Sequence, residues 1–505
     1  MNLSSLRRNT LATTLSGATI FLSATVAAAP ALAPVTHGVA AGDVTTESAV
    51  IWSRTDQPAY MHVLVDGRRN DSGAHEVVKV NADGDYTGKV RVTGLKAGRD
   101  YGYKVWFSTS KAGRPGVNGA AEGHFHTPPA NKDAEAVVFG WGGDLAGQNV
   151  CRDAVEGFPI FKAMNATEMD FFIGLGDMIY ADGVCNPTGL YGNAQVSGQF
   201  LQAANMADYW GHWRYNREDE GYRSLLASMP YYAIWDDHEV VNDFGPLHDT
   251  RTTPPYTPGV HLLPMGLKAM LDYNPILPAG NTPERLYRNI RWGKNVEMFI
   301  LDTRQYRDAN FVADSAKSPK TMLGREQVVW LKDALKKSNA TWKVIVSSVP
   351  MSIPTGSAGA AGRDGWANYQ ETGGFEYELT DILRYMQQNG MYNVVWITTD
   401  VHFSEVFRYT PFQDDPAPFQ DDPAFQVHEI VTGPINAGIF PNAAFDPTLG
   451  TVSLFRFPTT TPANYEEAKQ MFNFGLIEIA DDGTLVASIN GIDGAAWYEL
   501  RLPPH

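Results

Sequence analysis

The sequence predicts an α/β protein in which a small β-sandwich precedes a larger body of alternating strands and helices. Between residues 36 and 127, short runs of alternating polar and apolar residues are separated by Gly, Asp and Asn. Turn signals at such regular spacing are typical of a β-sandwich. From residue 137 on, nearly continuous apolar runs alternate with amphipathic stretches. This second pattern indicates a largely parallel sheet that is covered on both faces.

Composition and charge limit the kinds of partner. The chain has 505 residues, of which 44% are hydrophobic and 19% are charged, as in a packed globular protein. Its formal net charge of −16 argues against nucleic acid as a specific ligand and against an anionic membrane surface, because both would repel it. A small anionic substrate remains compatible with this charge if bound metal ions offset the field.

Residues 1–33 resemble an export signal. Arg7 and Arg8 precede an apolar run over 11–29 that contains no Lys, Asp or Glu and ends in small residues. The paired arginines favour the twin-arginine export machinery, and an ordinary secretory signal is the alternative. No later apolar run approaches the length of about 18 residues that spans a membrane. We therefore expect no transmembrane segment and a periplasmic or secreted bacterial protein.

Two further domains are expected after the signal. Residues 34–130 would form the β-sandwich, and the segment 92–105, VTGLKAGRDYGYKV, looks like the end of a fibronectin type III domain. The polar, Pro-containing segment 128–135 is typical of a linker. Residues 131–505 would then form the α/β body.

Polar residues follow the apolar runs of this body at the points where strands should end. The seven runs end at Asp144, Asp177, Glu239, Arg304, Pro350, Asp400 and Gly433. Ligands of parallel α/β sheets bind beyond the carboxyl ends of the strands. We therefore expect one rim of the body to carry Asp144, Asp177, Asp237, His238, Asp400 and His402. A carboxylate at the end of a buried strand is costly unless it is paired or bound to a cation.

Three of these motifs have spacings that suit metal ligands, and each has a structural alternative. Tyr180 follows Asp177 by three residues, so its phenol could bind the same hard ion, or it could pack in the core while Asp177 caps a helix. Asp400 and His402 lie on the same side of an extended segment, unless they are unpartnered loop residues. The third motif, WDDHEVVND, is either a ligand cluster or a solvated turn, and its candidate residues are Asp237, His238 and Asn242.

Together, these strand ends predict a site for two or more metal ions. Oxygen ligands dominate, which favours Ca²⁺, Mg²⁺, Mn²⁺ or Fe³⁺ over zinc bound by thiolates. Cys151 and Cys185 are the only cysteines, and in an exported chain they are expected to form one disulfide. The alternative is that Cys151 is a thiolate ligand of a metal.

Six motifs of this chain resemble those of the alkaline phosphatase D (PhoD-like) family of metallophosphoesterases. They are HGVAAGD (37–43), LGDMIYADG (175–183), WDDHEVVND (235–243), LDTRQYR (301–307), TTDVHF (398–403) and VTGPINAG (431–438). The resemblance covers nearly the whole mature chain. It implies a four-layer αββα sandwich preceded by a fibronectin type III/Ig-like β-sandwich. It also implies twin-arginine export and a site that holds Fe³⁺ and Ca²⁺, one to three ions in all, with Mn²⁺ or Mg²⁺ as substitutes.

The resemblance also implies roles for individual residues. Asp177 would bridge iron and calcium, Tyr180 would be the phenolate on iron, and Asp400 and His402 would be further ligands. Catalysis would involve Asp237, His238 and Arg304, and Arg304 would contact either phosphate or an inner carboxylate. Asp237 and Asn242 are also candidate ligands. Better-known members have a Cys thiolate on iron near the end of the first body strand, where this chain has Asp144.

The predicted function is hydrolysis of a small phosphate mono- or diester by a metal-bound hydroxide or oxide, for phosphate scavenging. A phospholipase of the same family and a non-catalytic calcium-dependent binding protein are the alternatives. Neither a Gly-x-Ser-x-Gly motif nor a P-loop is present. Substrate-binding residues are not identified by any motif. The Gly/Ala-rich segment 356–370 is expected to form a loop near the mouth of the site, where Arg363, Trp366 and Tyr369 could contact substrate.

Overall fold

The computed structural model describes residues 32–67, 75–113, 119–254, 256–278, 282–412 and 425–505. The expected export signal over 1–33 lies almost wholly outside the described residues, so it stays a prediction. In the described part of the chain, no helix is both long and apolar enough to cross a membrane.

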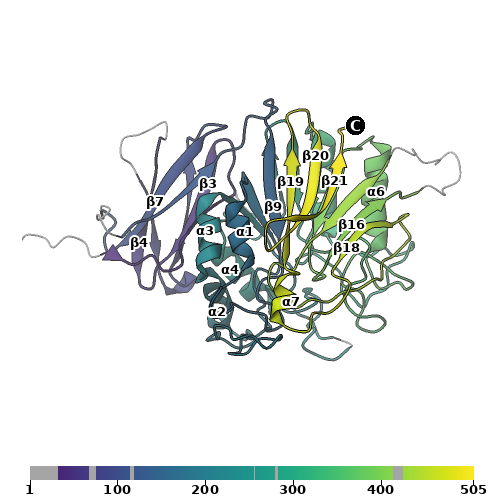
Figure 1. Cartoon of the computed structure of the whole chain (residues 1–505), viewed down its shortest axis with the longest axis horizontal. Helices are drawn as coiled ribbons and strands as arrows, with labels where there is room; N and C mark the ends of the chain where they lie inside the picture. Colours follow the sequence, from purple (N-terminus) through teal and green to yellow (C-terminus); the bar gives the residue numbers. More distant parts are fainter. Residues whose placement is uncertain (1–31, 68–74, 114–118, 255, 279–281, 413–424) are drawn as a thin grey trace, which may run out of the picture.

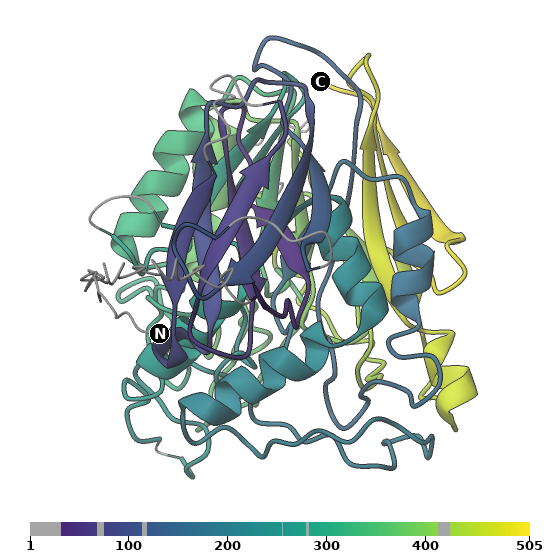
Figure 2. The same ribbon diagram turned by 90° about the vertical axis from the view of Figure 1, so that its left-hand side faces the viewer.

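Two antiparallel sheets form the N-terminal β-sandwich (Figure 2). The first has the order β1-β7-β4-β5, with β8 also paired to β7. Its strands are β1 (Leu32–Ala33), β4 (Ala59–Val65), β5 (Glu76–Val80), β7 (Asp100–Ser108) and β8 (Ala121–His126). The second consists of β2 (Val39–Gly42), β3 (Ser48–Arg54) and β6 (Thr87–Thr93), and a 3₁₀ turn, η1 (Ala82–Gly84), precedes β6.

This second sheet continues into the body of the protein. β2 pairs in parallel with β11, where Pro230 lies opposite Ala41, so one nine-stranded sheet has the order β21-β20-β19-β9-β10-β11-β2-β3-β6. The strands not yet named are β9 (Val137–Gly142), β10 (Phe171–Leu175), β11 (Pro230–Ile234), β19 (Asn473–Ile479), β20 (Leu485–Gly491) and β21 (Ala496–Leu502). The predicted boundary at 130/131 therefore divides a continuous sheet, and its position remains a prediction.

A seven-stranded sheet faces the nine-stranded one. Its order is β12-β13-β14-β15-β17-β16-β18, and β13, β14, β15 and β17 run parallel. The strands are β12 (Arg288–Trp292), β13 (Val296–Ile300), β14 (Trp342–Val346), β15 (Val394–Thr398), β16 (Ser404–Tyr409), β17 (Val427–Val431) and β18 (Val452–Phe457). All seven apolar runs expected in the body are strands, namely β9, β10, β11, β13, β14, β15 and β17.

Helices complete the four layers (Figure 1). They are α1 (Ile160–Ala166), α2 (Met206–Arg217), α3 (Glu220–Ser228), α4 (Leu263–Tyr273), α5 (Gly324–Lys337), α6 (Glu376–Gln388) and α7 (Tyr465–Lys469). Val344 and Val346 of β14 belong to the core shared with the nine-stranded sheet, whereas Ile345 packs in a second core with residues of α5 and α6. Successive residues of a strand face opposite sides, so this sheet is buried on both faces, as its sequence predicts.

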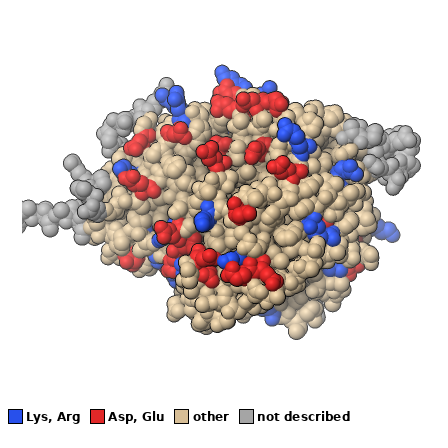
Figure 3. All heavy atoms as spheres, in the orientation of Figure 1, with Lys and Arg blue, Asp and Glu red and all other residues tan. Residues whose placement is uncertain are grey.

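Acidic and basic side chains are interspersed on the face drawn in Figure 3, and acidic groups gather near its upper and lower edges. No continuous basic patch interrupts the described residues of this face. The charge of the chain is therefore spread as a mixed surface on this side, whereas Asp144 and Asp177, which are discussed next, are buried.

Candidate metal centre

The predicted strand-end carboxylates converge at one rim between the two sheets. Asp144 follows β9, Asp177 follows β10 and Asp400 follows β15, each within two residues of the end of the strand. All three have left-handed backbones, with φ of 63°, 52° and 79°. Non-glycine residues rarely adopt this conformation, and clusters of such residues occur mainly at functional sites. Here the backbone turns sharply at each strand end and brings the three side chains together.

Four groups of acidic and imidazole side chains at this rim have ligand atoms that lie within 4.8 Å of one another. The groups are Asp144, Asp177 and His402; Asp177, Asp237 and His238; Asp236, Asp237 and Asp400; and Asp237, Asp243 and Asp364. Asp177 and Asp237 each belong to more than one group, so they lie where two neighbouring ions would share a ligand.

The first group includes the tyrosine that the sequence singled out. The hydroxyl of Tyr180 lies 2.7 Å from Nε2 of His402, and Nε2 lies 3.6 Å from Oδ1 of Asp144. Nδ1 of His402 donates to the carbonyl oxygen of Gly438 at 2.6 Å, so Nε2 carries no proton in the neutral ring and is the nitrogen that could bind a metal. Gly147 packs on the Tyr180 ring, and a Cβ there would lie 2.4 Å from it, so this position requires glycine.

His238 is held over Tyr180 by a carboxylate that the sequence analysis did not select. Its Nδ1 lies 2.7 Å from Oδ1 of Asp182, and its ring centroid lies 4.1 Å from that of Tyr180. Burial alone would lower the pKa of His238, but the Asp182 and Asp237 carboxylates raise it to about 10. Oδ2 of Asp182 also accepts from the backbone N–H of Asn242 at 2.9 Å, so Asp182 fixes both residues.

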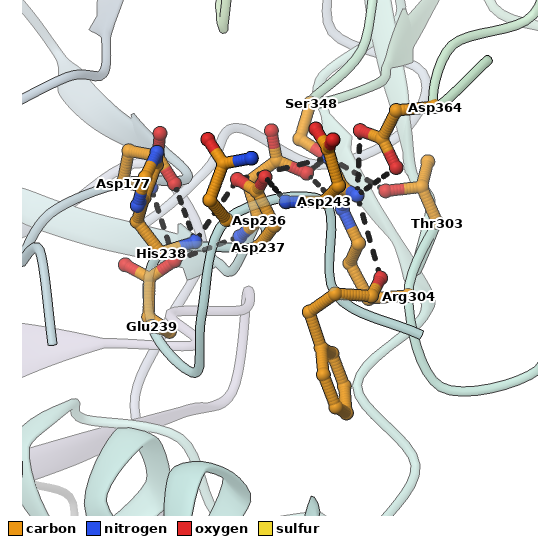
Figure 4. A network of polar contacts seen from close by, with 12 residues as sticks. Asp177, Asp236, Asp237, His238, Glu239, Asp243, Thr303, Arg304, Ser348 and Asp364 are labelled. Atoms are coloured by element: carbon orange, nitrogen blue, oxygen red, sulfur yellow. Dashed lines mark hydrogen bonds and ion pairs between the residues drawn. The ribbon is translucent and has the colours of Figure 1, made fainter. Parts of the chain in front are cut away.

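Arg304 lies behind the rim, where it is fully buried (Figure 4). Its Nε donates to Asp236, and its Nη1 donates to both oxygens of Asp364 at 2.8 Å. Arg307 donates to the same Asp364 carboxylate. Arg304 therefore contacts inner carboxylates, which are one of its two predicted kinds of partner.

Glu239 joins two of the strand-end loops (Figure 4). Its Oε2 accepts the backbone N–H of Asp177 at 3.0 Å and that of Asp236 at 2.8 Å, and its Oε1 accepts that of Met178 at 2.8 Å. Burial raises the pKa of Glu239 to about 8. Glu239 therefore positions the backbone of the candidate ligand Asp177 together with that of Asp236, the partner of Arg304.

Asp144, Asp177 and Asp400, the front carboxylates of the rim, form no ion pair with a described Lys or Arg. Burial, followed by repulsion from Asp236 and Asp237, raises the pKa of Asp144, Asp177 and Asp400 well above the usual range. Both oxygens of Asp144, Oδ2 of Asp177 and Oδ2 of Asp400 are buried without a hydrogen-bond partner. Buried oxygens without donors are costly, and a hard cation would satisfy them. The donor set thus fits the metal site that the sequence predicts.

The predicted ligand Asn242 is exposed and lines a cavity of about 480 Å³ that Asp237, His238, Asp400 and His402 also line. Cys151 and Cys185 form a disulfide, so neither offers a thiolate to a metal. This pairing agrees with the first expectation for the two cysteines and removes the alternative that Cys151 is a metal ligand.

The expectation for the 356–370 loop is wrong for Trp366. This side chain is fully buried in the second core, which also contains residues of α5 and α6, and its ring centroid lies 6.4 Å from that of Trp396. Arg363 pairs with Glu371 instead of lining the cavity. Asp364 lies between Arg363 and Trp366 in the sequence, and its carboxylate accepts hydrogen bonds from Arg304 at the site. The Gly-rich composition suggested an open loop, whereas the apolar ring and the buried carboxylate anchor it on both sides.

Three functional candidates were missed or left without a role by the sequence analysis, namely Asp182, Asp364 and Glu239. Asp182 lies inside the LGDMIYADG motif, so its spacing from Asp177 was a usable signal. No local pattern distinguishes Asp364, because its partners Arg304 and Arg307 are about sixty residues away. Glu239 was seen as part of the WDDHE cluster, but a carboxylate that accepts only backbone N–H groups leaves no mark in the sequence.

Comparisons with known proteins agree with this architecture. One protein with a related sequence is alkaline phosphatase D of Bacillus subtilis (strain 168), 26% identical over 266 residues. The match spans 49% of this chain and 43% of that protein's length. A structure of PhoD superimposes with a TM-score of 0.68 at 20% identity and covers 92% of this chain and 89% of the other.

A second structural neighbour is a purple acid phosphatase from yellow lupin (Lupinus luteus) seeds. Its TM-score is 0.58 at 14% identity, with 93% of this chain and 74% of that chain covered. Both neighbours share the fold, a four-layer metallophosphoesterase sandwich with a preceding β-sandwich. Residues 22–129 match the family described as PhoD-like phosphatase, N-terminal domain, and residues 139–481 match PhoD-like phosphatase. The chain therefore belongs to the PhoD-like phosphatase family.

Proposed function

We propose that this protein is a metal-dependent phosphatase or phosphodiesterase that hydrolyses small phosphate mono- or diesters. The observation that carries the proposal is the set of buried, unpartnered oxygens of Asp144, Asp177 and Asp400 beside an open cavity. An acidic chain can hold a phosphate ester only where bound cations reverse the local field. Membership of the PhoD-like phosphatase family points to the same chemistry.

Two overlapping ligand sets would hold the metal. Asp144, Tyr180 and His402 would bind one ion, Asp237, Asn242 and Asp400 would bind a second, and Asp177 would bridge them. We infer Fe³⁺ with Ca²⁺, and Mn²⁺ or Mg²⁺ as substitutes, since carboxylate and phenol oxygens suit hard cations. When bound, these ions would polarise the phosphoryl group and lower the pKa of a water molecule.

The side chains of the protein orient the substrate and move protons. His238 lines the cavity, and Asp182 holds its Nδ1, so its Nε2 is available to donate to a phosphoryl oxygen or to the departing alcohol. Oδ1 of Asp237 accepts from the backbone N–H of His238 at 2.9 Å, which fixes this ligand beside the imidazole. Arg304 is a positioning residue, because it contacts Asp236 and Asp364 and is fully buried.

Elemental analysis combined with hydrolysis of a chromogenic monoester and diester tests the proposal. We expect the purified protein to carry bound metal and to cleave at least one ester. Asp177→Ala removes the bridging ligand, so both metal content and activity should fall by more than tenfold. Asp381→Ala is the matched control, since Asp381 is an exposed residue of α6 that pairs with Lys332 of α5. Retained activity in Asp177→Ala, or a metal-bound wild type that cleaves neither ester, would remove the assigned role; the latter result favours a calcium-dependent binding protein.

We further infer that the protein is exported to the periplasm or secreted by the twin-arginine route. The paired Arg7 and Arg8 and the disulfide support this inference, because disulfides persist in oxidising compartments. Substitution of both arginines by Lys should retain the protein in the cytoplasm on cell fractionation. Unchanged export of that variant would favour the ordinary secretory signal.

A further inference from the structure

The cavity beside the candidate metal centre has a chemically divided wall. None of its described lining residues is Lys or Arg, so His238, which the proposed function assigns to the phosphoryl group and its leaving alcohol, is the cationic side chain of the described wall. One part of the wall carries the ligand candidates. The rest includes an apolar surface made of Ile353, Pro354, Val401, Phe403, Phe440 and Pro441.

Phe440 is the most exposed residue of this apolar surface. It is 48% exposed, whereas Ile353 and Phe403 are 1% exposed and belong to the core. The ring centroid of Phe440 lies 5.1 Å from that of His402, whose Nε2 faces Asp144 and Asp177. A phosphoryl group held by these ligands would place its ester substituent within reach of the Phe440 ring.

The segment that carries Phe440 is fixed on several sides. The backbone N–H of Asn436 donates to the carbonyl oxygen of Asp144 at 3.1 Å, and the N–H of Ile439 donates to the hydroxyl of Tyr191 at 2.8 Å. The carbonyl of Gly438 accepts from His402. A Cβ on Gly438 would lie 2.9 Å from the Phe440 ring, so the ring packs directly on this glycine. The backbone before Phe440 is therefore fixed, and the exposed ring lies between Gly438 and the His402 ring.

We propose that Phe440 determines specificity by packing its ring against the organic group of the phosphoester, so that esters of aromatic or bulky apolar alcohols bind better than methyl esters. This inference rests on the proposed function. In the hydrolysis, a water oxygen forms the new P–O bond, the ester P–O bond breaks, and the departing alcohol takes a proton. Phe440 supplies none of these atoms, so its contribution is a binding contact.

Paired phosphonates isolate this contact because they carry the same anionic group and cannot be hydrolysed. Phenylphosphonate and methylphosphonate differ only in the organic group, and their dissociation constants can be measured by titration calorimetry on the metal-loaded protein. Aromatic contacts and the area of a half-exposed ring predict about tenfold tighter binding of phenylphosphonate. Phe440→Ala should bring the ratio of the two constants close to one, and Phe440→Tyr should keep it.

Four outcomes decide the proposal. Methylphosphonate should bind Phe440→Ala as tightly as wild type, which shows an intact phosphate site, and Tyr377→Ala should keep the wild-type ratio because Tyr377 is an exposed aromatic residue on α6 outside the cavity. A Phe440→Ala protein that keeps the phenyl preference would overturn the role of Phe440 alone. Failure of methylphosphonate to bind metal-loaded wild type would overturn the proposed function, and the proposal about Phe440 with it.

Discussion

Glu239 offers a sharp test of how the candidate ligands are held. Its fully buried carboxylate accepts three backbone N–H groups, those of Asp177, Met178 and Asp236. Replacement by Gln keeps the shape and lets the amide oxygen accept the two N–H groups of Asp177 and Asp236. The amide NH₂ then faces the N–H of Met178, so one buried donor loses its acceptor.

The structure sets the size of the expected effect. A buried donor without a partner costs about 1–3 kcal/mol, and above a pH of about 8, where the Glu239 carboxyl is ionised, the two remaining hydrogen bonds also lose their charge-assisted strength. We therefore expect Glu239→Gln to lower the free energy of unfolding by about 2–4 kcal/mol. Because the loops of Asp177 and Asp236 lose their shared anchor, metal affinity should fall by about 10- to 100-fold, as is common when supporting groups of ligands are removed.

Chemical denaturation and metal titration together check this prediction, and Glu378 provides a matched control. The Glu378 carboxylate also accepts three donors, the N–H groups of Met322 and Leu323 and the hydroxyl of Thr321. Glu378 belongs to α6, its partners directly precede α5, and it lies outside the ligand groups. Glu378→Gln should lower stability without changing metal affinity. Equal metal affinity in wild type and Glu239→Gln would refute the reasoning, whatever the loss of stability.

Two other predictions concern the disulfide and pH. Replacing both Cys151 and Cys185 by Ser opens a loop with a sequence separation of 34. By the chain-entropy estimate, this change should lower the free energy of unfolding by about 3–4 kcal/mol. Equal denaturation midpoints for variant and wild type would contradict this prediction. Without metal, burial and neighbouring carboxylates raise the pKa of Asp236 to about 6 and that of Asp243 to about 8. A carboxyl whose pKa is higher in the folded chain stabilises the fold at low pH, and this contribution is lost as pH rises from about 4 to 8. The gain in Tm on adding metal should therefore grow between pH 5 and pH 8, and a gain that shrinks with pH would show that these groups do not face the metal.

The strands and the rim could be predicted because both follow from local sequence. Each parallel strand is a short apolar run, and the carboxyl ends of such strands meet at one edge whatever the order of the strands. Asp144, Asp177, Asp237 and Asp400 were therefore expected to converge before any partner was known, and their ligand atoms occur together in the four groups described.

Long-range pairing could not be predicted in the same way. β2 pairs with β11, about 190 residues later, and nothing in the alternation of β2 distinguishes that partner from another strand of the sandwich. The same limit applies to Asp364, whose loop composition suggested an open segment. Its position is set by Arg304 and Arg307, which belong to another strand-end loop.

Basic groups behind the rim pair with some of its carboxylates and leave others without a basic partner. Arg304 also lies 3.8 Å from Oδ1 of the candidate ligand Asp237. Arg304 pairs with Asp236, and Arg304 and Arg307 pair with Asp364, so the charge behind the rim is balanced within the chain. In the described part of the chain, no Lys or Arg forms an ion pair with the three front carboxylates, Asp144, Asp177 and Asp400.

The cost of burying these three front groups must be offset by protons or by cations from outside. A folded state that needs such cations binds them more tightly than the unfolded chain does, so metal binding and folding stability are linked. For an acidic protein, that linkage supplies both the stability of the rim and the positive field that an anionic substrate requires.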